Sequence, residues 1–178
     1  MTRAVLSLGS NLGDRIGHLR AAVRALGDLV VVVSGVYETP PWGGPGPDGR
    51  ESPPYLNAVV LAADDGDDPY SWLSRARDLE RAAGRDRDPS WRYAPRTLDV
   101  DVITVSAADG TPVVSTDPDL VLPHPRAYQR AFVLRPWLDI QPYAQLPGHG
   151  WVHDLVRADP VAADLPSVRP CADLSLEP

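Results

Sequence analysis

The sequence predicts a single domain that mixes β-strands and α-helices. Its 178 residues are enough for one hydrophobic core but not comfortably for two. Short apolar runs rich in β-branched residues alternate with segments whose apolar residues follow helical spacing, and Gly, Pro or Asp separates them. An apolar content of 43% and a charged content of 23% are ordinary for a globular protein.

The first part of the chain predicts two strands joined by a helix. Residues 4–8 form an apolar run that ends in a Gly-Ser-Asn turn, and residues 30–37 form a valine-rich strand in which Gly35 is a candidate bulge. Between them a helix opens near Asp14 and ends at Gly27. Its apolar positions are Ile16, Leu19, Val23 and Leu26. The Gly-Ser-Asn turn is also a weak candidate for an anion cradle.

A proline- and glycine-rich segment separates the second and third strands. Residues 38–47 hold too much Pro and Gly for regular structure but include Trp42, so this segment is either disordered or a binding loop. Residues 55–62 predict the third strand, with Tyr55 and Asn57 on one face. Asn57 either satisfies a neighbouring backbone group or offers its amide to a planar heterocycle.

A second helix begins at Asp68-Pro69 and ends at Gly84. Its predicted inward side chains are Leu73, Ala76, Leu79 and Ala83. We expect Arg77 and Glu80 elsewhere on its surface. Asp109-Gly110 predicts a hairpin between residues 103–106 and 111–114. Residues 133–140 are apolar enough for a core element. We expect the domain to span residues 1–156, followed by a loosely ordered acidic tail over 157–178.

The stretch from Arg85 to Asp101 is the most informative part of the chain. Four arginines precede an Asp-Val-Asp, namely Arg85, Arg87, Arg92 and Arg96. Residues 97–105 alternate as a strand, so Asp99 and Asp101 share one face. The opposite face carries Leu98, Val100, Val102 and Thr104.

Two neighbouring carboxylates on one strand face repel each other unless cations or arginines compensate them. Carboxylate oxygens suit Mg²⁺, and guanidinium groups match phosphate oxygens. The pattern therefore favours a site for a metal–triphosphate complex. The alternative is a surface strand whose aspartates form salt bridges to a solvated loop.

Charge and composition exclude several classes of function. The net charge is −7, which disfavours nucleic-acid binding, and all 17 basic residues are arginine, which favours a small anionic ligand. One cysteine excludes a disulfide framework. The sequence shows neither a signal peptide nor a membrane span, so we expect a cytoplasmic protein. His124 lies between two prolines and close to Arg126 and Arg130, which makes it either a structural histidine or a phosphate contact.

Five motifs stand in order along residues 3–145. They are LGSNLGD at 8–14, YETPPWG at 37–43, YLNA at 55–58, APRTLDVD at 94–101 and LPHP at 122–125. Together they resemble the 6-hydroxymethyl-7,8-dihydropterin pyrophosphokinase family. The resemblance implies a ferredoxin-like α+β fold, an antiparallel sheet covered by helices in a single domain. It also implies transfer of pyrophosphate from ATP to the pterin, with release of AMP, in folate biosynthesis.

The resemblance further implies a role for individual residues. Asp99 and Asp101 match the ligands of two magnesium ions, and Arg85 and Arg96 match catalytic arginines. The pterin pocket corresponds to Thr39, Pro40, Trp42, Tyr55, Asn57 and Phe132. The nucleotide contacts correspond to Glu80, Arg87, Arg92, His124 and Arg130. The expected partners are the two small-molecule substrates, and we expect a monomer.

Three positions depart from the family pattern: Tyr93, Arg77 and Asp119. They affect the expected contacts with the nucleotide base and leave the metal–phosphate chemistry intact. Two other functions are alternatives for such a site. A non-catalytic pterin- or nucleotide-binding protein would tolerate loss of an aspartate or a clamp arginine, and none is lost. A two-metal phosphodiesterase predicts a basic groove, which the net charge disfavours.

Overall fold

The computed structural model describes residues 1–41, 49, 51–66, 68–84 and 94–177. Its main sheet has the strand order β10-β3-β4-β1-β5, and β2 also pairs with β4. The sheet is antiparallel and consists of β1 (Thr2–Ser10), β2 (Val30–Val33), β3 (Tyr37–Thr39), β4 (Tyr55–Asp64), β5 (Asp99–Ala107) and β10 (Arg169–Pro170). The expected single α+β domain with an antiparallel sheet is confirmed.

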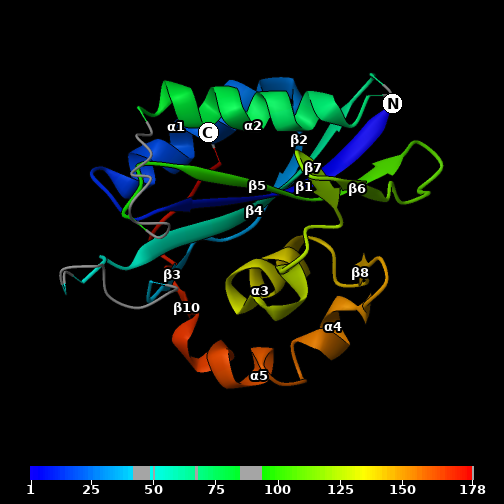
Figure 1. The fold of residues 1–178 in the computed structure, drawn as a ribbon. Coiled ribbons are helices and arrows are strands. Elements are labelled where there is room, and N and C mark those ends of the chain that lie inside the picture. Colours follow the sequence, from blue (N-terminus) through cyan, green and yellow to red (C-terminus); the bar gives the residue numbers. More distant parts are fainter. Residues whose placement is uncertain (42–48, 50, 67, 85–93, 178) are drawn as a thin grey trace.

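Helices cover both faces of this sheet. In Figure 1, α1 (Arg15–Leu26) and α2 (Tyr70–Ala82) lie on one face and α3 (Ala131–Ile140) on the other. Beyond α3 lie α4 (Val152–Leu155) and α5 (Val161–Asp164). Two short hairpins complete the fold, β6 (Ser115–Asp117) with β7 (Leu120–Leu122) and β8 (Gln145–Leu146) with β9 (Gly150–Trp151). No helix in the described ranges is long and apolar enough to cross a membrane.

The sheet divides the core in two because alternate side chains of its central strands face opposite helix layers. Leu6 and Leu8 of β1 belong to the cluster that includes α1 and α2 residues, whereas Val5 belongs to the cluster around α3. All three are buried. The central strands are buried on both faces, and their sequences are therefore continuous apolar runs. The cavity described below lies where β1, β4 and β5 meet α2 and the start of α3.

Both predicted helices form, with local signals close to those expected. The Asp14 side chain accepts a hydrogen bond from the Gly17 N–H at 3.0 Å and caps α1, and Gly27 ends it at a φ of 53°. Along α2, Ala76 and Leu79 are buried as expected. Glu80 was expected on the surface and is instead only 7% exposed, because its carboxylate has a buried hydrogen-bond donor.

Two predicted strands differ in detail. Residues 30–37 form β2 and β3 instead of one strand, and Ser34, which lies between them, bonds to the backbone of Val59 on β4 through its N–H and its hydroxyl. The alternation predicted along β5 ends at Val102, because the register with β1 shifts there. Val102 and Val105 consequently face the same core cluster, and Thr104 does not continue the face of Val100.

The segment after residue 156 was expected to be loosely ordered, and the structure corrects this. It forms α5, a 3₁₀ turn (Leu165–Ser167) and β10, whose residues Arg169 and Pro170 pair with Glu38 and Tyr37. Its buried side chains are Val161, Val168 and Leu176. These apolar residues follow no helix or strand period, but they fill gaps beside α3 and near α1, which is enough to order the segment.

Candidate active site

A cavity of about 440 Å³ opens where β1, β4 and β5 meet α2 and the start of α3. Most of the predicted site residues that the structure describes line it, although they come from distant parts of the chain. These are Pro40, Tyr55, Glu80, Arg96, Asp99, Asp101, His124, Arg130 and Phe132. Trp42, Arg85, Arg87 and Arg92 lie outside the described residues.

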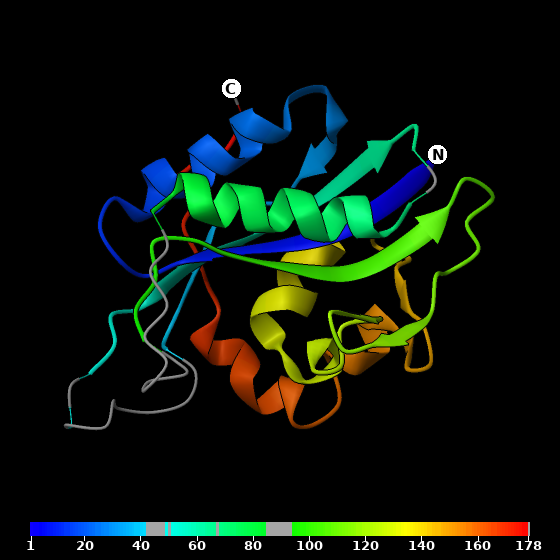
Figure 2. The same cartoon turned by 45° about the horizontal axis from the view of Figure 1, so that its top comes forward.

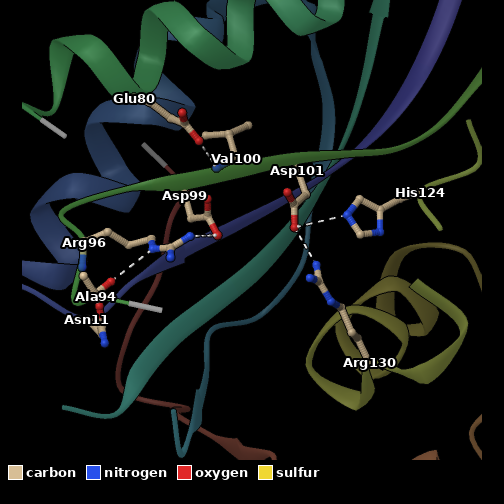
Figure 3. A network of polar contacts seen from close by, with 9 residues as sticks. All are labelled: Asn11, Glu80, Ala94, Arg96, Asp99, Val100, Asp101, His124 and Arg130. Carbon is tan, nitrogen blue, oxygen red and sulfur yellow. Dashed lines mark hydrogen bonds and ion pairs between the residues drawn. The ribbon is translucent and has the colours of Figure 1, made fainter. Parts of the chain in front are cut away.

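Asp99 and Asp101 lie on the same face of β5 and both line the cavity, as the alternation predicts (Figure 3). Each carboxylate has an arginine partner. Arg96 Nη1 lies 3.0 Å from Asp99 Oδ2, and Arg130 Nη1 lies 2.6 Å from Asp101 Oδ2. Both aspartate side chains remain nearly 30% exposed toward the cavity, at 28% and 29%. The arginines therefore offset the repulsion between two acids that still face a ligand.

Glu80 holds the backbone between the two aspartates. Its Oε1 accepts a hydrogen bond from the Val100 N–H at 3.0 Å, and the bond is buried (Figure 3). In the described part of the sheet β5 is an edge strand, so this N–H has no neighbouring strand on its outer side. Glu80 supplies the missing acceptor and thereby fixes the strand that presents Asp99 and Asp101.

Arg96 is positioned by Asn11, whose side chain is 1% exposed. Asn11 Oδ1 accepts from the Arg96 N–H at 2.8 Å, and the Asn11 N–H donates to the Arg96 carbonyl at 3.1 Å. Asn11 Nδ2 also donates to the Pro53 carbonyl at 3.0 Å. Burial is the largest single influence on the pKa of the Arg96 guanidinium and lowers it, but Asp99, Tyr55 and Asp101 together outweigh burial and the net direction is upward.

His124 is held in a defined ring orientation. Its backbone N–H donates to the Ile103 carbonyl at 2.8 Å, and its Nδ1 accepts from the Arg126 N–H at 3.2 Å. Nδ1 is thus unprotonated, and the ring proton sits on Nε2, which lies 3.8 Å from Asp101 Oδ2. Burial lowers the pKa of His124 and outweighs the opposing effect of Asp101. A neutral imidazole with its N–H turned toward the acid pair can donate to a phosphate oxygen.

The remaining wall of the cavity combines aromatic rings with a buried amide. Asn57 Nδ2 donates to Thr39 Oγ1 at 2.7 Å, and both residues are nearly fully buried behind the cavity. Gly9 pairs with Asn57 across β1 and β4, and a Cβ built on Gly9 would lie 3.3 Å from Asn57 Oδ1. Tyr55 and Phe132 line the cavity, and the Arg130 guanidinium lies 5.5 Å from the Phe132 ring centre. A flat heterocycle fits such surroundings.

The acid pair fits divalent cations that arrive with a phosphate ligand. Among the described residues no group of three or more His, Cys, Asp or Glu side chains gathers as a complete metal cage. Mg²⁺ does not need one, because it binds through one or two carboxylates together with water and substrate phosphates. Two partly exposed carboxylates with arginines alongside are a suitable donor set.

Several residues at this site were not predicted as site residues. Asn11 belongs to the Gly-Ser-Asn turn considered as an anion cradle, yet its N–H and side chain are used to hold Arg96. Arg126, Arg77 and Asp119 line the cavity, and Arg77 Nη2 lies 3.6 Å from Asp119 Oδ1 at the outer part of the site. In the sequence, Arg77 and Asp119 stand out only as departures from the family pattern at the expected base contacts.

Residues 5–142 match the family described as 7,8-dihydro-6-hydroxymethylpterin-pyrophosphokinase (HPPK). The chain is similar to proteins named 2-amino-4-hydroxy-6-hydroxymethyldihydropteridine pyrophosphokinase. The one from Mycobacterium tuberculosis is 45% identical over 95% of this chain and 89% of its own. The one from Mycobacterium leprae is 50% identical over 82% of this chain and 75% of its own.

Two solved structures with the same fold are each only 12% identical to this chain. A crystal structure of a Plasmodium falciparum HPPK-DHPS variant with pteroate has a TM-score of 0.64 at 12% identity and covers 96% of this chain. One of HPPK-DHPS in complex with substrates has a TM-score of 0.61 at 12% identity and covers 86% of this chain. This chain spans 44% and 42% of those two longer chains. From its family match and its relatives, the chain belongs to the 7,8-dihydro-6-hydroxymethylpterin-pyrophosphokinase (HPPK) family.

Proposed function

We propose that this chain transfers pyrophosphate from ATP to the hydroxymethyl group of 6-hydroxymethyl-7,8-dihydropterin and releases AMP, a step of tetrahydrofolate biosynthesis. One observation carries the proposal. A single cavity joins an acid pair, two arginines and a neutral histidine to an aromatic wall backed by a buried amide. The acid pair with the arginines and the histidine suits a metal–triphosphate, and the aromatic wall with its amide suits a pterin ring.

Asp99 and Asp101 are the proposed ligands of two magnesium ions, which when bound neutralise phosphate charge. The cations would replace Arg96 and Arg130 as partners of these carboxylates. The two guanidinium groups would then be available to hold phosphate oxygens. His124 would donate its Nε2 proton to the same phosphate chain. The roles proposed for Arg85, Arg87 and Arg92 are also in phosphate binding.

The pterin is proposed to lie between Tyr55 and Phe132, next to Pro40 and Trp42. Asn57 reads its polar edge, because the hydrogen bond to Thr39 fixes the orientation of the amide. The hydroxymethyl oxygen then attacks the β-phosphorus of ATP. The bond from that phosphorus to the oxygen of AMP breaks, and the hydroxyl proton leaves to solvent. No general base is assigned.

Two further proposals concern the setting of the reaction. We propose a monomer, because the chain is a small single domain that carries this family's motifs. We also propose a cytoplasmic location, where ATP is available. Light scattering after size-exclusion chromatography tests the first proposal, and a mass near twice 19.3 kDa would contradict it.

The experiment that tests the activity follows the adenine product. The protein is incubated with ATP, magnesium and 6-hydroxymethyl-7,8-dihydropterin, and nucleotides are separated by chromatography. AMP that forms only when the pterin is present supports the proposal. ADP would show single-phosphoryl transfer instead. Tight pterin binding without turnover would favour a binding protein, and AMP formed without pterin would favour hydrolysis.

A further inference from the structure

A second, smaller cavity of about 200 Å³ lies beside the proposed pterin pocket. One side of it is formed by Thr39, Pro40 and Phe132, which are all assigned to the pterin. Pro40 and Phe132 also line the large cavity, so these two residues form a wall between the two spaces. The opposite side is formed by Asp164, Ser167 and Val168, which lie beyond the residues that match the family.

The C-terminal segment touches both elements that carry this wall. Arg169 pairs with Glu38 in an antiparallel register, so Val168 lies one step further along, beside Thr39. Val161 and Val168 belong to the same hydrophobic cluster as Ala131 at the start of α3, and Phe132 packs against this cluster. Figure 1 shows α5 and β10 running below α3 to the edge of the sheet at β3.

The proposed pterin pocket depends on the distance between these two elements. Pro40 follows β3 and Phe132 lies in the first turn of α3, and the described backbone of β3 pairs with β4 and β10, not with α3. Val168 is 8% exposed, lies beside Thr39, and belongs to the hydrophobic cluster against which Phe132 packs. Val168→Ala removes two methyl groups from this cluster, which lets the side chains that pack on it shift.

We propose that the C-terminal segment 161–170 supports the pterin site from behind its wall, and that Val168 positions Phe132 and Pro40 and thereby sets the affinity for the pterin but not for ATP. The inference rests on the proposed function, since it takes the pterin to lie against Phe132. Val168 acts through these two residues and touches no reacting atom.

The chain offers a matched control in Val156. It belongs to the same hydrophobic cluster, is also 8% exposed, and lies at the end of α4 away from Thr39, Pro40 and Phe132. Val168→Ala and Val156→Ala remove the same atoms from the same core. The two variants should therefore lower the melting temperature by similar amounts and differ only in their effect on the pterin.

The experiment measures KM for each substrate, and the Kd of the pterin by calorimetry in the presence of magnesium and a non-hydrolysable ATP analogue. Val168→Ala should raise the pterin values roughly two- to tenfold, the lower part of the range that coupling between neighbouring residues produces, while the KM for ATP stays within about twofold. Val156→Ala should leave both substrates within about twofold. Equal effects of the two variants, or equal effects on the two substrates, would overturn the proposal.

A double-mutant cycle with Phe132→Ala tests the route of the effect. If Val168 acts through Phe132, Val168→Ala should have little further effect on the pterin Kd once Phe132 is alanine. An undiminished effect in that background would contradict positioning. Phe132→Ala alone also separates this inference from the proposed function. If it leaves the pterin Kd unchanged, the pterin assignment itself is wrong, whatever Val168 does.

Discussion

The carboxylate of Glu80 accepts a hydrogen bond from the backbone N–H of Val100, with 3.0 Å between Oε1 and N (Figure 3). Val100 is the residue between the two acids of the site, so a side chain on α2 determines where β5 runs. Glu80→Ala would leave this buried N–H unsatisfied at a cost of about 1–3 kcal/mol. Glu80→Gln keeps an oxygen acceptor and should lose less.

We therefore expect Glu80→Ala to lower both the free energy of unfolding and turnover, and Glu80→Gln to retain most of the stability. Urea unfolding and steady-state kinetics measure the two effects. If both variants lose turnover equally while Glu80→Gln stays stable, the negative charge of Glu80 itself is needed. That result would favour direct contact with the nucleotide.

Removing either carboxylate of the acid pair should abolish most of the activity without unfolding the protein. Asp99→Asn and Asp101→Asn each remove an anionic ligand from a partly exposed position and leave the apolar face of β5 untouched. A metal contribution of several kcal/mol corresponds to a loss in kcat of roughly 10²–10³ or more.

The readouts for these variants are kcat, magnesium affinity by calorimetry with an ATP analogue, and circular dichroism. Asp109→Asn serves as a control, since Asp109 is an exposed turn residue far from the cavity lining. Near-normal turnover in Asp99→Asn or Asp101→Asn would remove that residue from the proposed metal site.

Capping residues and strand alternation predict those parts of the structure that depend only on residues close together in the sequence. The helix that begins at Asp14 and the shared face of Asp99 and Asp101 follow from capping and from the period of a strand. The burial of Glu80 cannot be predicted from such patterns. Helical spacing puts it one turn after the buried Ala76, but a carboxylate is expected at the surface unless its partner is known. That partner, an edge-strand N–H, lies in another element.

The order of the C-terminal segment was missed for a related reason. Val161, Val168 and Leu176 fit neither a helical nor a strand period, and the pairing of Arg169 with Glu38 joins residues far apart in the sequence. Asn11 is a similar case, because its hydrogen bonds to Arg96 and Pro53 form only once three distant segments meet. Nothing in the local sequence around these residues specifies such contacts.

Asn57→Ala should weaken pterin binding far more than ATP binding. The amide is fixed by its bond to Thr39, which is assigned to the pterin pocket. A lost hydrogen-bonding group with buried partners costs about 1–3 kcal/mol, or roughly 5- to 150-fold in Kd. Calorimetric titrations with each ligand measure this difference. Equal losses for both ligands would mean that Asn57 only supports the fold.

Gly9→Ala should also impair pterin binding, because a Cβ at this position crowds the amide of Asn57. The added carbon would lie 3.3 Å from Asn57 Oδ1, so that amide must move by a few tenths of an ångström, whereas Tyr55 Cδ1 at 3.5 Å would be in ordinary contact. Overpacking of this kind costs about 1–3 kcal/mol. Gly35→Ala is the control, since its Cβ would meet its nearest atom at 3.9 Å. Unchanged pterin affinity in Gly9→Ala would contradict this account.

Tyr37 should give the protein a stability that declines at alkaline pH. Its hydroxyl donates to Asp139 Oδ2 at 2.7 Å, and burial, together with this bond, raises the pKa of Tyr37 from 10.0 to about 12. The unfolded chain then loses this proton before the folded one. The contribution is complete below about pH 10, and it is lost as the pH rises toward 12.

Tyr37→Phe removes this titration and should make the free energy of unfolding less dependent on pH above about 9, by roughly 1–3 kcal/mol over the full range. Urea unfolding of both proteins between about pH 8 and pH 11 measures the difference in slope. The two free energies of unfolding should differ by a constant amount at the low end of this range and converge as the pH rises above about 10. Parallel curves would show that the Tyr37 hydroxyl ionises at the same pH in the folded and unfolded chains, and that the bond to Asp139 does not hold its proton.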